Sequence, residues 1–144
     1  MIKTKKIKKN KPIVYDRSKN ILLIRKNSVI DKKISFKGKI IVGMDACLWG
    51  NIECDEILIG KSTYIKGEVR CRKATVGAKT EFNSIIGDEI SIQNGCKGQY
   101  VKGKTVIIRK NVEIKSLEAE TAYIDGISKL GRIDVKKVVA SKSS

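Results

Sequence analysis

The same small and apolar residues return every sixteen or seventeen positions along most of this 144-residue chain. One column consists of Val42, Ile59, Val76, Ile92, Ile108, Ile124 and Ala140, with steps of 17, 17, 16, 16, 16 and 16 residues. A second column, two residues earlier, keeps the same steps: Ile40, Ile57, Ala74, Ile90, Val106, Ala122 and Val138. A fixed period of this length indicates a solenoid, in which each repeat packs on the next.

Within each period the apolar residues come in pairs spaced i and i+2, which is the spacing of residues on one face of a β-strand. One period contains three such pairs, for example Ile57/Ile59, Thr63/Ile65 and Val69/Cys71. None of the paired positions is Lys, Arg, Asp or Glu, although 32% of the chain is charged. The pairs therefore predict coils of three short strands, stacked in parallel and in register around a dry core.

We predict an all-β fold with a single domain, a parallel β-helix of about seven coils over residues 20–140. The general bias of parallel β crossovers predicts a right-handed coil. A sandwich or barrel is the alternative, but its strands recur at 8–12 residues with variable turns and would not keep one register. Residues 1–19, which contain Pro12, lack the period and are predicted to form a flexible basic arm, and residues 141–144 form a short polar tail.

The positions between the pairs are expected to form the corners and the outer surface of the coil. Gly43, Gly60 and Gly77 follow one column, where glycine would supply corner conformations that other residues enter at a cost. Trp49 and Tyr64 flank inward positions, so both rings are predicted to lie outside.

The net charge of +16 is unevenly distributed. Residues 1–39 contain 14 Lys and Arg with 2 Asp and Glu, whereas residues 40–144 contain 17 and 13. This asymmetry indicates a basic segment that binds an acidic partner, and the alternative is a tail that only improves solubility. No transmembrane run and no secretory signal are present, so we expect a cytoplasmic protein.

The four cysteines match no zinc motif, and the chain has no C-x-x-C. Cys54 and Cys71 occupy one column in adjacent coils and Cys96 another, so these three are predicted to be small core residues, while Cys47 points outward. A Cys54–Cys71 disulfide is disfavoured in a reducing compartment.

The chain has no histidine, which argues against two families with a similar short-strand rhythm. Hexapeptide-repeat acyltransferases use a His general base, and the related zinc carbonic anhydrases need His ligands. The carboxylate pairs Asp55/Glu56 and Asp88/Glu89 fall at coil corners, where we expect them to be solvated, and no P-loop is present. We therefore predict no catalytic residues, no metal site and no cofactor; a divergent hexapeptide-type enzyme is a distant alternative.

A unit of apolar residue, Gly, apolar residue and a strand ending in apolar-Gly recurs in the chain, as in CLWGNIECDEILIG and YIKGEVRCRKATVG. On this unit, the stretch from about Ile34 to Ala140 resembles a bactofilin domain. The later coils depart from it at Gln93, Arg109 and Asp125, where the apolar-Gly corner is lost. The resemblance implies a right-handed β-helix that assembles end to end into filaments without nucleotide, as a scaffold for cell-wall or morphogenetic proteins at the inner face of the membrane.

The resemblance also implies that the N-terminal segment attaches to membrane. A bulky apolar residue beside Met and the basic residues after it stand where the family has its attachment segment: Met1, Ile2, Lys3, Lys5, Lys6, Lys8 and Lys9. Each basic residue near an anionic leaflet contributes about 1 kcal/mol, and the apolar residues supply a second weak signal. Nucleic acid is the less favoured partner, because no aromatic residue that could stack on bases precedes Tyr15.

The two ends of a solenoid are expected to present unpaired strand edges and the apolar ends of its columns. At the first coil these residues are Leu22, Ile24, Ile30, Ile34 and Phe36, and at the last coil they are Leu130, Ile133, Val135 and Val138. Stacking one end on another continues the sheet and hides both edges, and a contact that does not close produces a fibre. The sequence therefore predicts a filament-forming scaffold; the alternative is a basic solenoid adaptor for nucleic acid or a protein partner.

Overall fold

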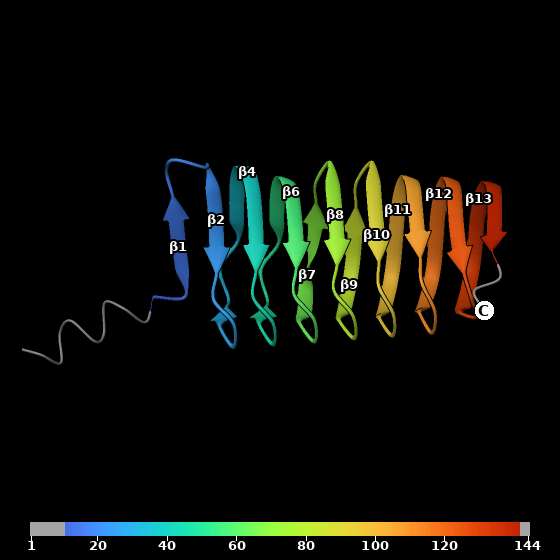
Figure 1. Cartoon of the computed structure of the whole chain (residues 1–144), viewed down its shortest axis with the longest axis horizontal. Coiled ribbons are helices and arrows are strands. Elements are labelled where there is room, and N and C mark those ends of the chain that lie inside the picture. The colour runs from blue at the N-terminus through green and yellow to red at the C-terminus, as the bar shows by residue number, and fades with distance from the viewer. Residues whose placement is uncertain (1–10, 142–144) are drawn as a thin grey trace, which may run out of the picture.

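The computed structural model describes residues 11–141, which form a parallel β-solenoid of about eight turns (Figure 1). No helix occurs in this range. The strands are β1 (Ile13–Asp16), β2 (Ile21–Ile24), β3 (Val29–Ile30), β4 (Ile34–Val42), β5 (Cys47–Leu48), β6 (Ile52–Ile59), β7 (Tyr64–Arg70), β8 (Lys73–Val76), β9 (Glu81–Ile86), β10 (Glu89–Ile92), β11 (Lys97–Ile108), β12 (Glu113–Asp125) and β13 (Lys129–Ser141).

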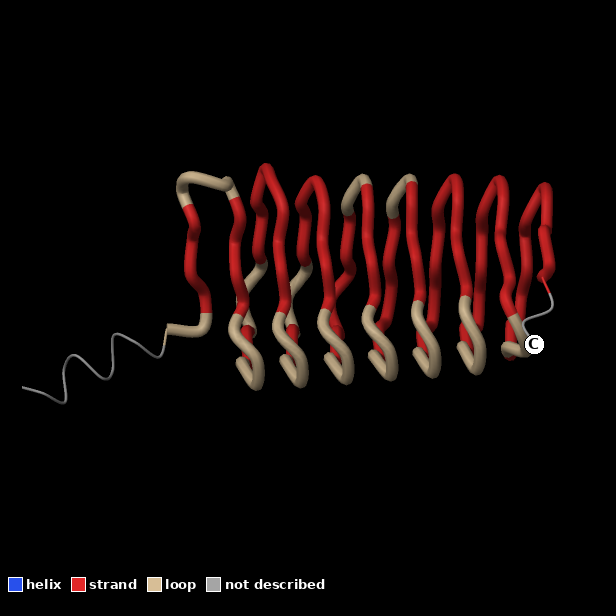
Figure 2. Tube along the Cα trace, viewed as in Figure 1, coloured by secondary structure: helices blue, strands red, loops and turns tan. Residues whose placement is uncertain are grey.

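Each coil has three faces, because the longer strands bend at the corners and continue from one face to the next. Face A contains β2, β8 and β10 with the C-terminal parts of β4, β6, β11, β12 and β13. Face B contains β3 and β5 with the first residues of β7, β9, β11, β12 and β13. Face C contains the remaining segments, from Ile34–Phe36 to Arg132–Val135. Loops lie mainly in a row at the corner between faces A and B (Figure 2).

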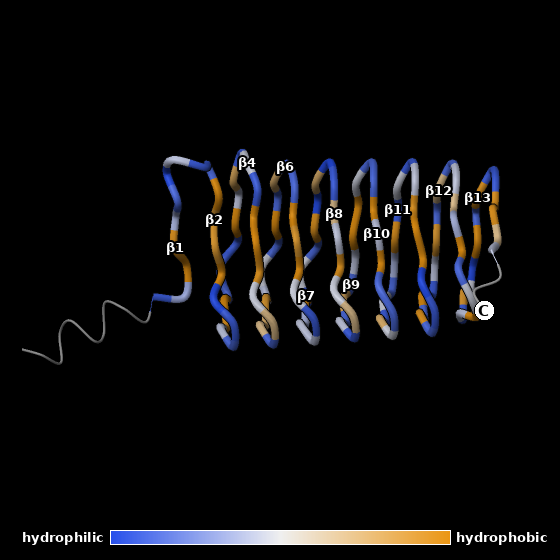
Figure 3. The backbone as a smooth tube through the Cα atoms, viewed as in Figure 1, coloured by the Kyte–Doolittle hydropathy of each residue, from blue (hydrophilic) through white to orange (hydrophobic). Residues whose placement is uncertain are grey.

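The strand register confirms the columns predicted from the repeat. On face A the residues paired between neighbouring strands form one series through every coil: Leu22, Ile40, Ile57, Ala74, Ile90, Val106, Ala122 and Val138. These residues point inward, and from Ile40 to Ala122 none is more than 2% exposed. The hydrophobic colour recurs along every coil in Figure 3. Like residues stack on like, which suits the β-branched side chains on a pleated surface.

Two register shifts explain why the period shortens along the chain. Between Phe36 and Lys39, partners change from 18 residues apart to 17. Between Ile65 and Glu68, the separation changes from 17 to 16. Each shift is a β-bulge that absorbs one extra residue without moving the inward columns.

The corner glycines have a different role from the one predicted. A Cβ at Gly43, Gly60 or Gly77 would collide with the backbone of the preceding coil, so these glycines are required by close stacking. The left-handed conformations occur two residues later, at Asp45, Ser62 and Lys79, and in other coils at Asn27, Gly95 and Asn111. The amide of each donates a hydrogen bond to the next coil, as from Ser62 to the carbonyl oxygen of Ala78 at 2.9 Å, and the ladder thus continues through the corner.

The prediction of a flexible arm over residues 1–19 is wrong for its second half. Ile13–Asp16 form β1, which pairs antiparallel with β2, from Ile13 opposite Ile24 to Asp16 opposite Ile21. The turn after β1 is stabilised by Asp16, which accepts hydrogen bonds from the amide and hydroxyl of Ser18 at 3.1 and 2.8 Å; these bonds lower the pKa of the Asp16 carboxyl. Residues 1–10, including the predicted membrane-binding residues, lie outside the described part of the chain.

Candidate assembly surfaces at the two ends

The N-terminal end of the solenoid is partly closed by its own chain. β1 covers the edge of β2, and Ile13 packs against the core. Tyr15 meets Phe36 edge to face, with ring centroids 5.7 Å apart. The Arg25 amide donates to the Pro12 carbonyl oxygen at 2.9 Å, and the Arg25 Nε to the Lys11 carbonyl oxygen, also at 2.9 Å. The end is therefore covered on face A.

The predicted end residues of the first coil offer little side-chain surface for a joint. Ile24, Ile30 and Ile34 are between 2% and 8% exposed, and Leu22 and Phe36 are half-buried against the core. On faces B and C, however, the strand edges stay open within the described residues: β3 pairs only with β5, and Ile34–Phe36 only with β6. These two edges thus remain available for parallel strand addition, while on face A the outermost strand is the antiparallel β1, which pairs only with β2 among the described strands.

The C-terminal end is open on all three faces. β13 pairs only with β12 among the described strands, so its outer edge is unpaired along its length. Ile133 and Val138, both predicted as end residues, are 48% and 51% exposed, while Leu130 and Val135 are partly buried against the core. Ile127, which is 84% exposed, was missed because it lies at a corner outside the paired columns.

Both ends carry excess positive charge. Residues 11–39 contain nine basic residues, of which Lys39 alone forms an ion pair within the described residues, with Glu56 at 3.7 Å. The acidic residues in this range are Asp16 and Asp31. The last coil contains Lys129, Arg132, Lys136 and Lys137 with Asp134. The N-terminal basic residues flank β1 and recur at the corners of the first coil, and together they are named the basic collar: Lys11, Arg17, Lys19, Arg25, Lys26, Lys32, Lys33, Lys37 and Lys39.

A shallow groove of about 580 Å³ runs along the corner between faces C and A. Its floor contains Cys71, Gly87, Gly103 and Ala119, and its rims carry charges of both signs, including the Lys102–Glu118 ion pair at 3.3 Å. Burial raises the pKa of Cys71 to about 12 and that of Cys54, in the same column, to about 12. Burial also raises the pKa of Cys96. All four cysteines are free thiols.

The remaining predictions fall on the walls of the solenoid. Trp49 and Tyr64 lie outside as predicted, 44% and 38% exposed, and form an edge-to-face pair with centroids 6.0 Å apart. The Lys66 ammonium lies 4.8 Å from the centre of the Trp49 ring. Over residues 11–141, no group of three His, Cys, Asp or Glu side chains is arranged to hold a metal ion. No membrane-spanning helix is found in the same range.

Comparison with known proteins finds no match to a family model, a curated protein or a solved structure.

Proposed function

We propose that this protein is a structural scaffold of the bactofilin type, which assembles end to end into filaments without nucleotide. The observation that carries the proposal is the open C-terminal coil, where Ile133 and Val138 are exposed beside an unpaired strand edge along β13. Such an edge is a template for further strands, and single-chain proteins normally protect it. The two open edges on faces B and C of the first coil support a second joint at the other end.

The test is negative-stain electron microscopy of the purified full-length chain, with no ATP or GTP present. We expect filaments of the wild type and their loss in Ile133→Glu, because Ile133 continues the inward column of Leu117 and a carboxylate there would be buried in the apolar part of the joint. Tyr64→Glu is the matched control, because Tyr64 is also exposed but lies on the side wall. Circular dichroism must show that both variants fold. Monomers of the wild type at high concentration would contradict the proposal.

We also propose that residues 1–10 attach the scaffold to an anionic membrane, which would place it at the cytoplasmic face. The support is compositional: Met1 and Ile2 precede five lysines in these ten residues. Co-sedimentation with vesicles containing phosphatidylserine should fall strongly when residues 1–10 are deleted. This deletion leaves Lys11 and β1 in place, so the solenoid keeps its N-terminal cover. Equal pelleting by both forms would remove the membrane from the proposal.

The basic collar supports one alternative, a solenoid adaptor that binds nucleic acid. Lysines and arginines at successive corners would contact phosphates without contacting bases. Binding would therefore show little sequence preference and would depend steeply on salt. A DNA shift assay beside the vesicle experiment separates the two partners. Binding to DNA that survives deletion of residues 1–10 and is lost in Lys32→Glu/Lys33→Glu would favour the adaptor.

A further inference from the structure

Face A differs from the other two walls because one of its outward columns is entirely uncharged. The strand register connects nine of them in one column from β1 to β13: Val14, Leu23, Ile41, Leu58, Thr75, Ser91, Ile107, Tyr123 and Val139. The corresponding column of face C is Ser35, Glu53, Arg70, Ile86, Lys102, Glu118 and Asp134. A chain that is 32% charged thus keeps charge out of one complete outward column.

The first strands of face A read as apolar runs, ILLI in β2 and ILI at the end of β6, while β8 and β10 place the small polar residues Thr75 and Ser91 outward. Runs of this kind are typical of parallel strands that are covered on both sides, whereas strands with one solvated side alternate apolar and polar residues. The outer side is nevertheless uncovered in the single molecule: Leu23, Tyr123 and Val139 are 37%, 44% and 36% exposed. Gly43, Gly60 and Gly77 border the column in three successive coils, whereas Arg25, Gln93, Arg109 and Asp125 hold the same position in other coils.

A second outward column on face A carries charges that alternate in sign. In register it runs Ile21, Lys39, Glu56, Lys73, Glu89, Thr105, Thr121 and Lys137. A twofold axis in the plane of the face and parallel to the strands reverses the order of the coils. With the axis between the coils of Glu56 and Lys73, each of these faces the other in a second copy, and Lys39 faces Glu89. The column is thus complementary to itself.

We propose that face A packs on face A of a second copy, with the two solenoids antiparallel. About eight coils at a strand spacing of about 4.8 Å make the face nearly 40 Å long, and strands of about five residues make it roughly 15 Å wide. Two such faces bury on the order of 1,100 Å², which exceeds the roughly 1,000 Å² expected of a biological interface. Glu56 and Glu89, at the margin of the face and about midway along the solenoid, oppose an anionic membrane as the occupant. The lateral contact is independent of the proposed end joints.

The first test substitutes the outward column and measures association by sedimentation velocity. Ile107→Lys should weaken lateral association about tenfold or more, because it places an unpaired charge in the apolar contact. Ile86→Lys is the control: both isoleucines are half-buried and point outward, but Ile86 lies on face C. The measurements are made in the Ile133→Glu background, so that end joints do not contribute. Equal association by the two variants would overturn the proposal.

The second test uses the wild-type chain and does not depend on a substitution. A mixture of ¹⁴N- and ¹⁵N-labelled protein is treated with a carbodiimide, which joins a carboxylate to an amine without a spacer. Peptides of mixed label that join Glu56 to Lys73, or Lys39 to Glu89, are expected. Mixed-label peptides confined to other faces would reject the antiparallel contact. Vesicle binding that is lost in Ile107→Lys but kept in Ile86→Lys would assign face A to a membrane and overturn the proposal.

Discussion

Single residues set how closely successive coils can stack. Gly98 lies directly over the Phe82 ring of the preceding coil, and a Cβ at this position would overlap the ring atoms. The two residues share a column with Ile65 and Ile114, so a large ring in one coil is accommodated by the absence of a side chain in the next. The large side chain of one coil and the missing side chain of the next therefore fill the core together, although neither coil alone has the average side-chain volume at this column.

This pairing predicts that Gly98→Ala destabilises the solenoid by about 1–3 kcal/mol, which is the usual range for overpacking a close-packed core. The free energy of unfolding is measured in urea. In Phe82→Leu/Gly98→Ala the ring is gone, so the cost of the alanine should largely disappear, as a double-mutant cycle would show. Additive effects of the two substitutions would contradict the proposed contact.

Cys54 and Cys71 make stability sensitive to alkaline pH. Burial raises the pKa of each from 9.0 to about 12 in the folded chain. Below pH 9 both thiols are protonated in either state, and their contribution is complete. Between pH 9 and about 12 the unfolded thiols ionise first, so stability falls with rising pH, by at most about 1.4 kcal/mol per thiol and pH unit. Cys54→Ala/Cys71→Ala should show a shallower fall in urea unfolding across this window than the wild type.

Among the elements, the repeated strands could be predicted and β1 could not. The i, i+2 pairs fix which side of each strand is buried, and the constant step fixes the register, as Ile40 over Ile57 shows. β1 is four residues long, antiparallel and outside the period, so no repeat signals it. The uncharged outward column of face A could not be recognised from the sequence, because only the strand register shows that its residues lie on one face.

β1 is predicted to protect the edge of β2 in the single molecule. Deleting residues 1–17 removes Pro12, whose carbonyl oxygen accepts the Arg25 amide, and leaves the face A edge unpaired. The Arg25 amide should then exchange with solvent deuterium about ten times faster or more, because a protected edge becomes an open one. Deletion of residues 1–10 is the control and should leave its exchange rate unchanged. Similar rates in both truncated forms would show that β1 does not hold this edge.

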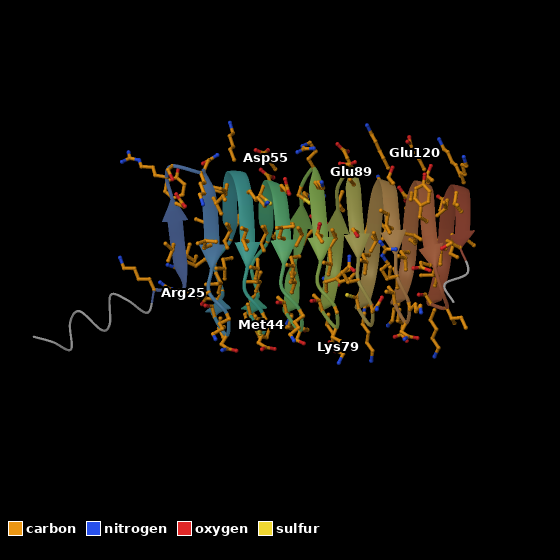
Figure 4. All side chains as sticks on the ribbon, viewed as in Figure 1. Arg25, Met44, Asp55, Lys79, Glu89 and Glu120 are labelled. Atoms are coloured by element: carbon orange, nitrogen blue, oxygen red, sulfur yellow. The ribbon has the colours of Figure 1, made fainter. Side chains whose placement is uncertain are left out.

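At the scale of the whole molecule, charge is separated between ends and walls. The basic collar and the last coil are both positive, whereas residues 40–128 contain 12 basic and 12 acidic residues, among them Asp55, Glu89 and Glu120, which project outward (Figure 4). The corner between faces A and B carries Arg25 and Lys79 among others. Any joint between two ends therefore brings like charges together, whereas face A offers charges of alternating sign.

The two contacts should consequently respond to salt in opposite directions. The Debye screening length falls from about 10 Å at 0.1 M salt to about 3 Å at 1 M. Added NaCl should therefore promote end-to-end assembly, which is measured by light scattering. Added NaCl should weaken the lateral pair of solenoids in the Ile133→Glu background, which is measured by sedimentation velocity.

The double substitution Lys32→Glu/Lys33→Glu lowers the charge of the collar by four and should permit end joints at low salt. The control Lys97→Glu/Lys115→Glu makes an equal change of charge on the side of the solenoid and should not permit end joints at low salt. Assembly independent of salt in both variants and the wild type would show that end charge does not control the joint.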